Sequence, residues 1–126
     1  MKKILVVDDE QVFLNLMARV LGESGYRVAT AGGGEEGFAA VGSARPDLVV
    51  TDLIMPGLDG VQLIRKLKEG YAGIPVIAMS GGGRTLDTDL TLKSVANLGV
   101  KAILRKPFSH DDLLQAVDEA LAAGHS

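Results

Sequence analysis

Short runs of aliphatic residues alternate with longer segments of helical periodicity along the chain. Runs such as 4–7 and 48–50 contain no polar position, which is typical of strands buried on both faces. The alternation repeats five times and predicts a parallel sheet with helices on both faces. The expected strands span residues 3–7, 26–31, 48–52, 76–79 and 101–104.

The helical segments carry capping signals at their starts. Asp9 is the expected N-cap of the first helix, and Asp59 with Gln62 has the spacing of a capping box for the third. Ser109 and Asp112 are expected to cap the last helix. The second and fourth helices are expected at about 35–41 and 87–98. The first helix is expected to bury one apolar face, which consists of Phe13, Leu16, Met17, Val20 and Leu21.

Polar residues stand at the ends of four expected strands. Asp8 and Asp9 follow the first strand, Asp52 closes the third, Ser80 follows the fourth, and Lys106 lies just beyond the fifth. In an open α/β sheet the carboxyl ends of the strands form the edge where ligands bind. Taken alone, each of these residues could equally be a helix cap, a turn residue or a surface residue without a function. Their joint occurrence predicts one site.

Three carboxylates at one edge repel each other, and each has its pKa raised unless a cation lies among them. Oxygen ligands of this kind suit Mg²⁺, which binds one or two carboxylates together with a phosphate. Lys106 and Ser80 can offer an ammonium and a hydroxyl to phosphoryl oxygens. A carboxylate in such a setting can attack phosphorus and form an aspartyl phosphate.

Composition narrows the function classes. The 126 residues suffice for one domain, expected at 1–123 with a frayed tail at 124–126. A net charge of −3 without a run of Lys and Arg disfavours a nucleic-acid groove. The chain has no cysteine, which excludes disulfides and thiol catalysis. No apolar run reaches membrane-spanning length, so a cytoplasmic domain without nucleic-acid or membrane partners is expected.

The chain resembles the receiver domains of two-component response regulators. The resemblance rests on Asp8-Asp9, on Asp52 with Met55-Pro56-Gly57 and Asp59-Gly60, on Ser80, and on Lys106-Pro107-Phe108, and it covers nearly the whole chain. It implies a flavodoxin-like (βα)5 fold, a three-layer sandwich whose parallel five-stranded sheet has the order 2-1-3-4-5. It also implies a cis bond between Lys106 and Pro107, which proline makes tolerable.

The same resemblance implies a role for each motif residue. Asp52 is the expected phosphoacceptor, and Mg²⁺ is expected to bind Asp8, Asp9, Asp52 and the backbone carbonyl of Ile54. Ser80 is similar to the family's switch hydroxyl, and Lys106 to its phosphate-pairing lysine. The implied function is a signalling switch rather than an enzyme. The phosphoryl donor is expected to be a sensor histidine kinase or a histidine phosphotransfer protein.

The implied output is altered binding of a downstream protein. By analogy, the signalling face includes helix four, strand five and helix five, with Lys93, Lys101, Arg105 and His110. The chain itself contains no output domain, which leaves a stand-alone receiver, a phosphorelay intermediate or an excised fragment open. A monomer or a weak homodimer is expected.

The chain departs from the family pattern in three ways. Ile103 stands where the family usually has an aromatic residue, so the usual hydroxyl–aromatic switch is not expected to operate in its common form. The segment after Ser80 is longer than usual, with glycines at 81–83 and Arg84 as a residue that could reach a phosphoryl group. Ile54 and Gly82 occupy positions that orient the hydrolytic water in the family, and neither carries an acid or an amide. Slow hydrolysis of a phosphorylated Asp52 is therefore expected.

Two alternatives are weighed against the switch. A Mg²⁺-dependent phosphatase would need a general acid two residues after Asp52, where Ile54 stands, and a cap over the substrate. A degenerate receiver that only binds partners would not need the five motif elements.

One further sequence motif has to be considered: the segment Gly32-Gly-Gly34-Glu-Glu-Gly37 matches G-x-G-x-x-G, the pattern of dinucleotide-binding loops. Its glutamates would repel a pyrophosphate at the helix start, so dinucleotide binding is not expected.

Overall fold

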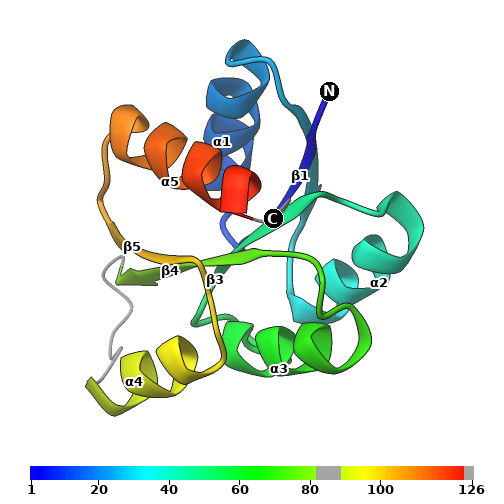
Figure 1. The fold of residues 1–126 in the computed structure, drawn as a ribbon, viewed down its shortest axis with the longest axis vertical. Helices are drawn as coiled ribbons and strands as arrows, with labels where there is room; N and C mark the ends of the chain where they lie inside the picture. The colour runs from blue at the N-terminus through cyan, green and yellow to red at the C-terminus, as the bar shows by residue number, and fades with distance from the viewer. Residues whose placement is uncertain (82–88, 124–126) are drawn as a thin grey trace.

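A computed structural model describes residues 1–81 and 89–123 of the chain. Five strands form one parallel sheet in the order β2-β1-β3-β4-β5 (Figure 1). The strands are β1 (Lys3–Val7), β2 (Arg27–Ala31), β3 (Leu48–Asp52), β4 (Val76–Gly81) and β5 (Ala102–Lys106). The predicted parallel sheet and its order 2-1-3-4-5 are confirmed.

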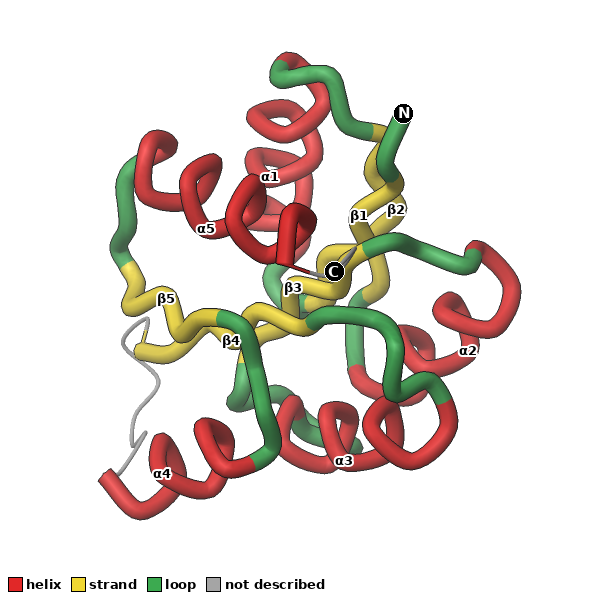
Figure 2. Tube along the Cα trace, in the orientation of Figure 1, coloured by secondary structure: helices red, strands yellow, loops and turns green. Residues whose placement is uncertain are grey.

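Helices cover both faces of the sheet, so the molecule has three layers (Figures 1 and 2). The helices α1 and α5 lie on one face, and α2, α3 and α4 lie on the other. Their bounds are α1 (Gln11–Glu23), α2 (Gly34–Ala44), α3 (Gly60–Gly70), α4 (Asp89–Asn97) and α5 (His110–Ala123). Residues 82–88, which include the expected start of the fourth helix, and the tail at 124–126 lie outside the described residues.

Alternate residues of each central strand feed two separate cores. In β1, Ile4 and Val6 pack into the cluster under α1 and α5, whereas Leu5 and Val7 pack into the cluster under α2, α3 and α4. All four side chains are fully buried. Since burial of one such side chain stabilises the fold by about 1.5–3 kcal/mol, the central strands hold the carboxyl edge of the sheet rigidly.

Two capping predictions are confirmed and one is wrong. Asp59 and Gln62 form the complete capping box of α3, with bonds of 2.9 and 3.0 Å between side chain and backbone. The Ser109 hydroxyl accepts the amide hydrogen of Asp112 at 3.0 Å. At α1, however, the N-cap is Glu10 rather than Asp9, and its side chain makes no capping bond.

The apolar face of α1 also differs from the prediction. Leu16 is 43% exposed, and Leu14 is buried in its place beside Met17, Val20 and Leu21. Leu14 and Leu16 are two residues apart, so they lie on opposite sides of a helix, and only one of them can face the core. In the described part of the chain, none of the helices is both long and apolar enough to cross a membrane.

Candidate functional site

The strand ends bring the predicted site residues to one edge of the sheet. Oxygens of Asp8, Asp9 and Asp52 all lie within 4.8 Å of one another, although the residues come from two different strand ends. Lys106, the last residue of β5, reaches across β4 toward the same carboxylates. Ser80 lies on β4 between them, one residue beyond the register partner of Asp52. The sequence prediction of one common site is therefore supported by position.

Asp52 is a buried carboxylate, with 4% of the residue exposed. Its Oδ1 accepts the amide hydrogen of Leu53 at 3.0 Å, and its Oδ2 lies 3.7 Å from the Lys106 ammonium. Burial raises the pKa of Asp52 to about 6, and the negative charges of Asp8 and Asp9 act in the same direction. Lys106 and the Leu53 amide oppose this rise only in part. The group is thus ionised above about pH 6 at a substantial energetic cost.

Lys106 forms its shortest ion pair with Asp8. The ammonium lies 2.7 Å from Oδ2 of Asp8, and the lysine side chain is only 9% exposed. The other oxygen of Asp8 accepts the amide hydrogen of Glu10 at 3.0 Å. Asp8 therefore bonds both the residue that precedes α1 and the lysine, whereas the sequence assigned the start of this helix to its neighbour Asp9.

Ser80 has a different environment from the acids. Its hydroxyl is buried and has no hydrogen-bond partner among the described residues. A buried polar group without a partner costs about 1–3 kcal/mol, so native proteins keep one where it serves a purpose. A hydroxyl at this edge of the sheet is available to a ligand oxygen.

A glycine sets the distance between Asp52 and the loop that follows it. A Cβ atom on Gly60 would lie 1.9 Å from the carbonyl oxygen of Asp52, and the Gly60 amide donates to the carbonyl of Leu53 at 3.0 Å. Only a residue without a side chain allows this approach. The first turn of α3 is thereby held against the residue that carries the proposed chemistry.

The donor set fits a hard divalent cation. Asp8, Asp9 and Asp52 supply carboxylate oxygens close enough to share one ion, and no soft ligand stands among them. Ile54 is half-buried in the loop after β3, and its side chain packs on the core beneath α2 and α3. Binding of the metal ion by the backbone carbonyl of Ile54 stays a prediction.

The G-x-G-x-x-G segment has a packing explanation. A Cβ atom on Gly34 would lie 2.2 Å from the carbonyl oxygen of Leu58, so the start of α2 touches the loop after β3 directly. The hollow beside it, of about 380 Å³, is lined by Glu35 and Glu36 as well as by glycines. These exposed carboxylates leave a negative entrance, which disfavours a pyrophosphate.

The positions that depart from the receiver pattern are only partly described. Ile103 is half-buried in β5 and packs on the core cluster beneath α4. Gly82 and Arg84 lie outside the described residues. The peptide bond between Lys106 and Pro107 is cis, as predicted.

A doubly wound parallel sheet with an acidic cluster and a lysine at its carboxyl edge defines the class of protein as receiver-like. The family model of the response regulator receiver domain matches residues 4–118. The chain therefore belongs to the response regulator receiver domain family, whose members act in two-component signalling as switches.

Similar proteins include several transcriptional regulators. The transcriptional regulatory protein GlrR of Escherichia coli is 36% identical over 118 residues, which cover 94% of this chain and 26% of that protein. The alkaline phosphatase synthesis transcriptional regulatory protein PhoP of Bacillus subtilis is 37% identical over 108 residues, which cover 86% of this chain and 43% of that protein. The chain thus spans about a quarter to a half of the length of the curated relatives it matches.

Similar solved structures include isolated receiver domains. A receiver domain protein from Clostridium thermocellum has a TM-score of 0.88 at 32% identity, with 98% of this chain and 96% of that chain covered. A CheY-like receiver domain protein from Methanospirillum hungatei has a TM-score of 0.92 at 27% identity, with 99% and 97% covered. These comparisons confirm the predicted family and fold. The expectation of no nucleic-acid partner stays a prediction, because relatives such as MtrA of Mycobacterium tuberculosis are named DNA-binding response regulators.

Proposed function

We propose that the chain is a phosphoacceptor switch in which Asp52 takes a phosphoryl group from a phosphohistidine of a sensor kinase or phosphotransfer protein. The observation that carries the proposal is the arrangement around Asp52. A buried carboxylate lies within 4.8 Å of two further acids and 3.7 Å from a lysine ammonium. Such a group is a nucleophile in a site built to balance negative charge.

The transfer exchanges one bond to phosphorus for another. A carboxylate oxygen of Asp52 bonds to phosphorus while the bond from phosphorus to the imidazole nitrogen breaks, and the imidazole leaves with the electron pair. The reaction needs the ionised form of Asp52, which predominates above about pH 6 even before a cation binds. Lys106, 3.7 Å from Oδ2 of Asp52, is placed to pair with an oxygen of the new phosphoryl group. The unpartnered hydroxyl of Ser80 is available to another of these oxygens.

Asp8, Asp9 and Asp52 would hold Mg²⁺, together with the carbonyl of Ile54. Bound there, the ion would supply positive charge against the carboxylates and the transferring group. Without such a cation, the negative charges of Asp8 and Asp9, which add to the effect of burial on the pKa of Asp52, would also oppose the approach of an anionic donor.

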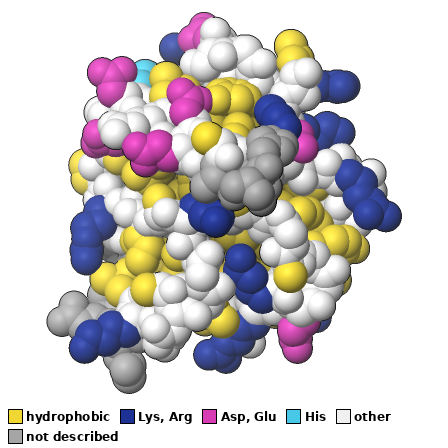
Figure 3. All heavy atoms as spheres, viewed as in Figure 1, with side chains coloured by type: hydrophobic (Ala, Val, Ile, Leu, Met, Phe, Trp, Pro, Cys, Tyr) yellow, Lys and Arg dark blue, Asp and Glu magenta, His cyan; other side chains and the backbone are white. Residues whose placement is uncertain are grey.

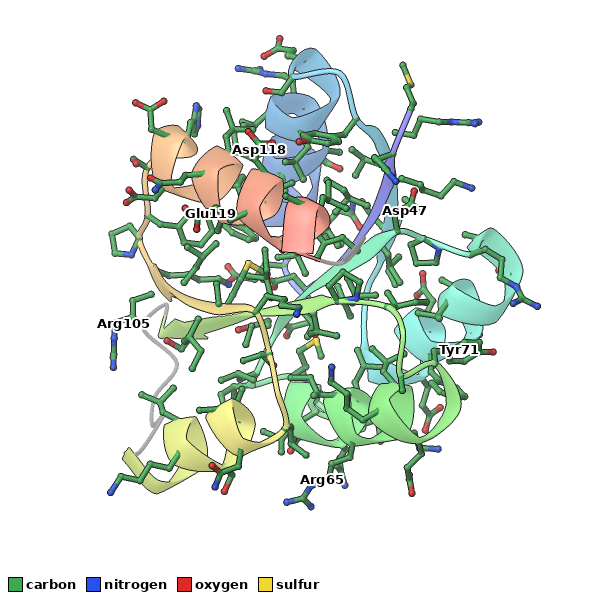
Figure 4. The ribbon with its side chains drawn as sticks, viewed as in Figure 1. Asp47, Arg65, Tyr71, Arg105, Asp118 and Glu119 are labelled. Carbon is green, nitrogen blue, oxygen red and sulfur yellow. The ribbon has the colours of Figure 1, made fainter. Side chains whose placement is uncertain are left out.

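The output would be a changed protein-binding face. The residues named for it by analogy are all exposed: Lys93, Lys101, Arg105 and His110. Arg105 projects outward from the β5 edge of the sheet (Figure 4). Beside it, acidic side chains gather over α5 (Figure 3), and the exposed acids of this helix are Asp111, Asp112, Asp118 and Glu119. This face therefore offers both charge signs to a partner.

The test is the intact mass of the protein after incubation with acetyl phosphate and Mg²⁺. We expect one phosphoryl adduct in the wild type, and none in Asp52→Asn or when Mg²⁺ is withheld. Asp111→Asn is the matched control, because Asp111 is an exposed acid in the first turn of α5. An adduct that persists in Asp52→Asn would contradict the assignment of the acceptor. Multiple turnover of a phosphomonoester would favour a phosphatase instead.

A further inference from the structure

The ammonium of Lys106 lies over an aromatic ring that comes from a distant part of the chain. Its Nζ is 4.2 Å from the centroid of the Phe13 ring, which α1 supplies. The sequence identifies Phe13 only as a member of the apolar face of that helix. Its contact with the lysine at the end of β5 follows from the fold.

The ring itself is held in place. Phe13 is half-buried in the cluster under α1 and α5, and it meets Phe108 edge to face with centroids 6.1 Å apart and planes at 82°. Phe108 follows Lys106 by two residues. The aromatic pair therefore fixes the position of the ring relative to the segment that carries the lysine.

The ring adds attraction without adding a negative charge. A cation over the face of an aromatic ring is drawn to it electrostatically, and more strongly where water is largely excluded. The Lys106 side chain is 9% exposed, and its ammonium lies 2.7 Å from Asp8 and 3.7 Å from Asp52. The two acids and the ring together restrict the positions that the ammonium can occupy. A further carboxylate in place of the ring would add to the negative charge of Asp8 and Asp9, which together with burial raises the pKa of Asp52.

We propose that Phe13 is a positioning residue for phosphoryl transfer, whose ring face holds the Lys106 ammonium beside Asp52. The role rests on the proposed function of Asp52 as acceptor. Phe13 touches neither phosphorus nor metal in this proposal and acts through Lys106. A residue that merely filled the core would be replaceable by any apolar side chain of similar volume.

The test compares variants that separate ring electronics from packing. Phe13→Leu keeps an apolar side chain and removes the ring, and Phe13→Tyr keeps the ring. Site-specific fluorination of Phe13 weakens the negative face of the ring stepwise with little change in shape. Phe38→Leu is the matched control. Phe38 also carries a lysine over its ring, with Nζ of Lys66 at 5.3 Å, but this pair lies on the opposite face of the sheet.

The first readout is the chemical shift of the Lys106 ε-methylene protons in the Mg²⁺-free protein. Protons above an aromatic face are shifted upfield by the ring current. We expect this shift in the wild type and in Phe13→Tyr, and its loss in Phe13→Leu. If the Lys106 ε-methylene protons of the wild type showed no upfield shift, the ammonium would not lie over the ring, and the proposal would be overturned.

The second readout is the rate of phosphorylation by acetyl phosphate. We expect Phe13→Leu to be slower by roughly three- to tenfold, and Phe13→Tyr to stay within about twofold of the wild type. Phe38→Leu is expected to leave the rate unchanged, and each added fluorine on Phe13 to lower it further. If Phe13→Leu were phosphorylated at the wild-type rate, the positioning role would be overturned. If the leucine variant does not fold, the same conclusion follows from a wild-type rate in the protein whose Phe13 ring carries the most fluorine atoms. Failure of the proposed function would look different, because the wild type itself would then form no adduct.

Discussion

Asp52→Asn is expected to stabilise the fold while it abolishes the proposed chemistry. The pKa of Asp52 is raised from 3.8 to about 6, so the folded state binds a proton at this group more tightly than the unfolded state does. A raised pKa gives stability that is fully present below the unfolded value and is lost as the pH rises through the folded value. Above about pH 6 the ionised carboxylate is therefore a net cost to the native state.

The size of this cost follows from the two pKa values. A difference of about two pKa units corresponds to roughly 3 kcal/mol at pH 8. At pH 5 it falls to about 1.5 kcal/mol, because Asp52 is then mostly protonated in the folded state and mostly ionised in the unfolded state. Asn is close in shape to the protonated acid, and its oxygen can still accept the hydrogen bond of the Leu53 amide, whose nitrogen lies 3.0 Å from Oδ1 of Asp52. The variant should thus gain most of this free energy of unfolding.

Urea denaturation followed by circular dichroism in EDTA would measure the gain at both pH values. The gain should be about twice as large at pH 8 as at pH 5. Asp111→Asn, which removes an exposed charge near a helix start, should change stability by no more than about 0.5 kcal/mol. If Asp52→Asn were no more stable than the wild type at pH 8, or equally stabilised at both pH values, the burial argument would be refuted.

Three further outcomes are expected. Gly60→Ala should lower the free energy of unfolding by at least about 2 kcal/mol in urea denaturation, because its Cβ would lie 1.9 Å from the Asp52 carbonyl oxygen, whereas Gly70→Ala has open space and should be tolerated. Ile54→Asn should quicken loss of the phosphoryl group, followed by mass spectrometry, while Ile54→Ala should slow it no further. A half-life of only seconds for the phosphorylated wild type would contradict this expectation. A phosphomimetic should move amide NMR signals of α4, β5 and α5, and unmoved signals there would count against the proposed face.

The sheet and the site were predictable for one physical reason. Strands buried on both faces leave a clear apolar signal, and the polar residue at each strand end marks the edge where parallel strands finish. Asp8, Asp52 and Lys106 could be grouped from the order of these ends alone. Local capping chemistry was equally readable at Asp59 and Gln62, whose partners are three residues apart.

Features set by packing between distant segments were not predictable in this way. The pattern on α1 allows either Leu14 or Leu16 to face inward, and the position of the helix against β1 and α5 decides for Leu14. The contact between Phe13 and Lys106 joins the first helix to the last strand, and no spacing in the sequence encodes it. The start of α1 depends on the hydrogen bond that the Glu10 amide donates to the Asp8 carboxylate, which an acid at a strand end can accept only once the chain turns there.

The burial that destabilises Asp52 also prepares the site for a cation. Lys106 is paired most closely with Asp8 at 2.7 Å and lies farther from Asp52 at 3.7 Å, so the acceptor keeps much of its unfavourable charge. A divalent ion that binds only the folded state stabilises it in proportion to the logarithm of its concentration over Kd. Because the Asp52→Asn variant would supply one charged ligand fewer, Mg²⁺ should stabilise the wild type more than this variant. The stability gap at pH 8 should therefore narrow as Mg²⁺ is added. A gap independent of Mg²⁺ would show that the ion does not share its site with Asp52.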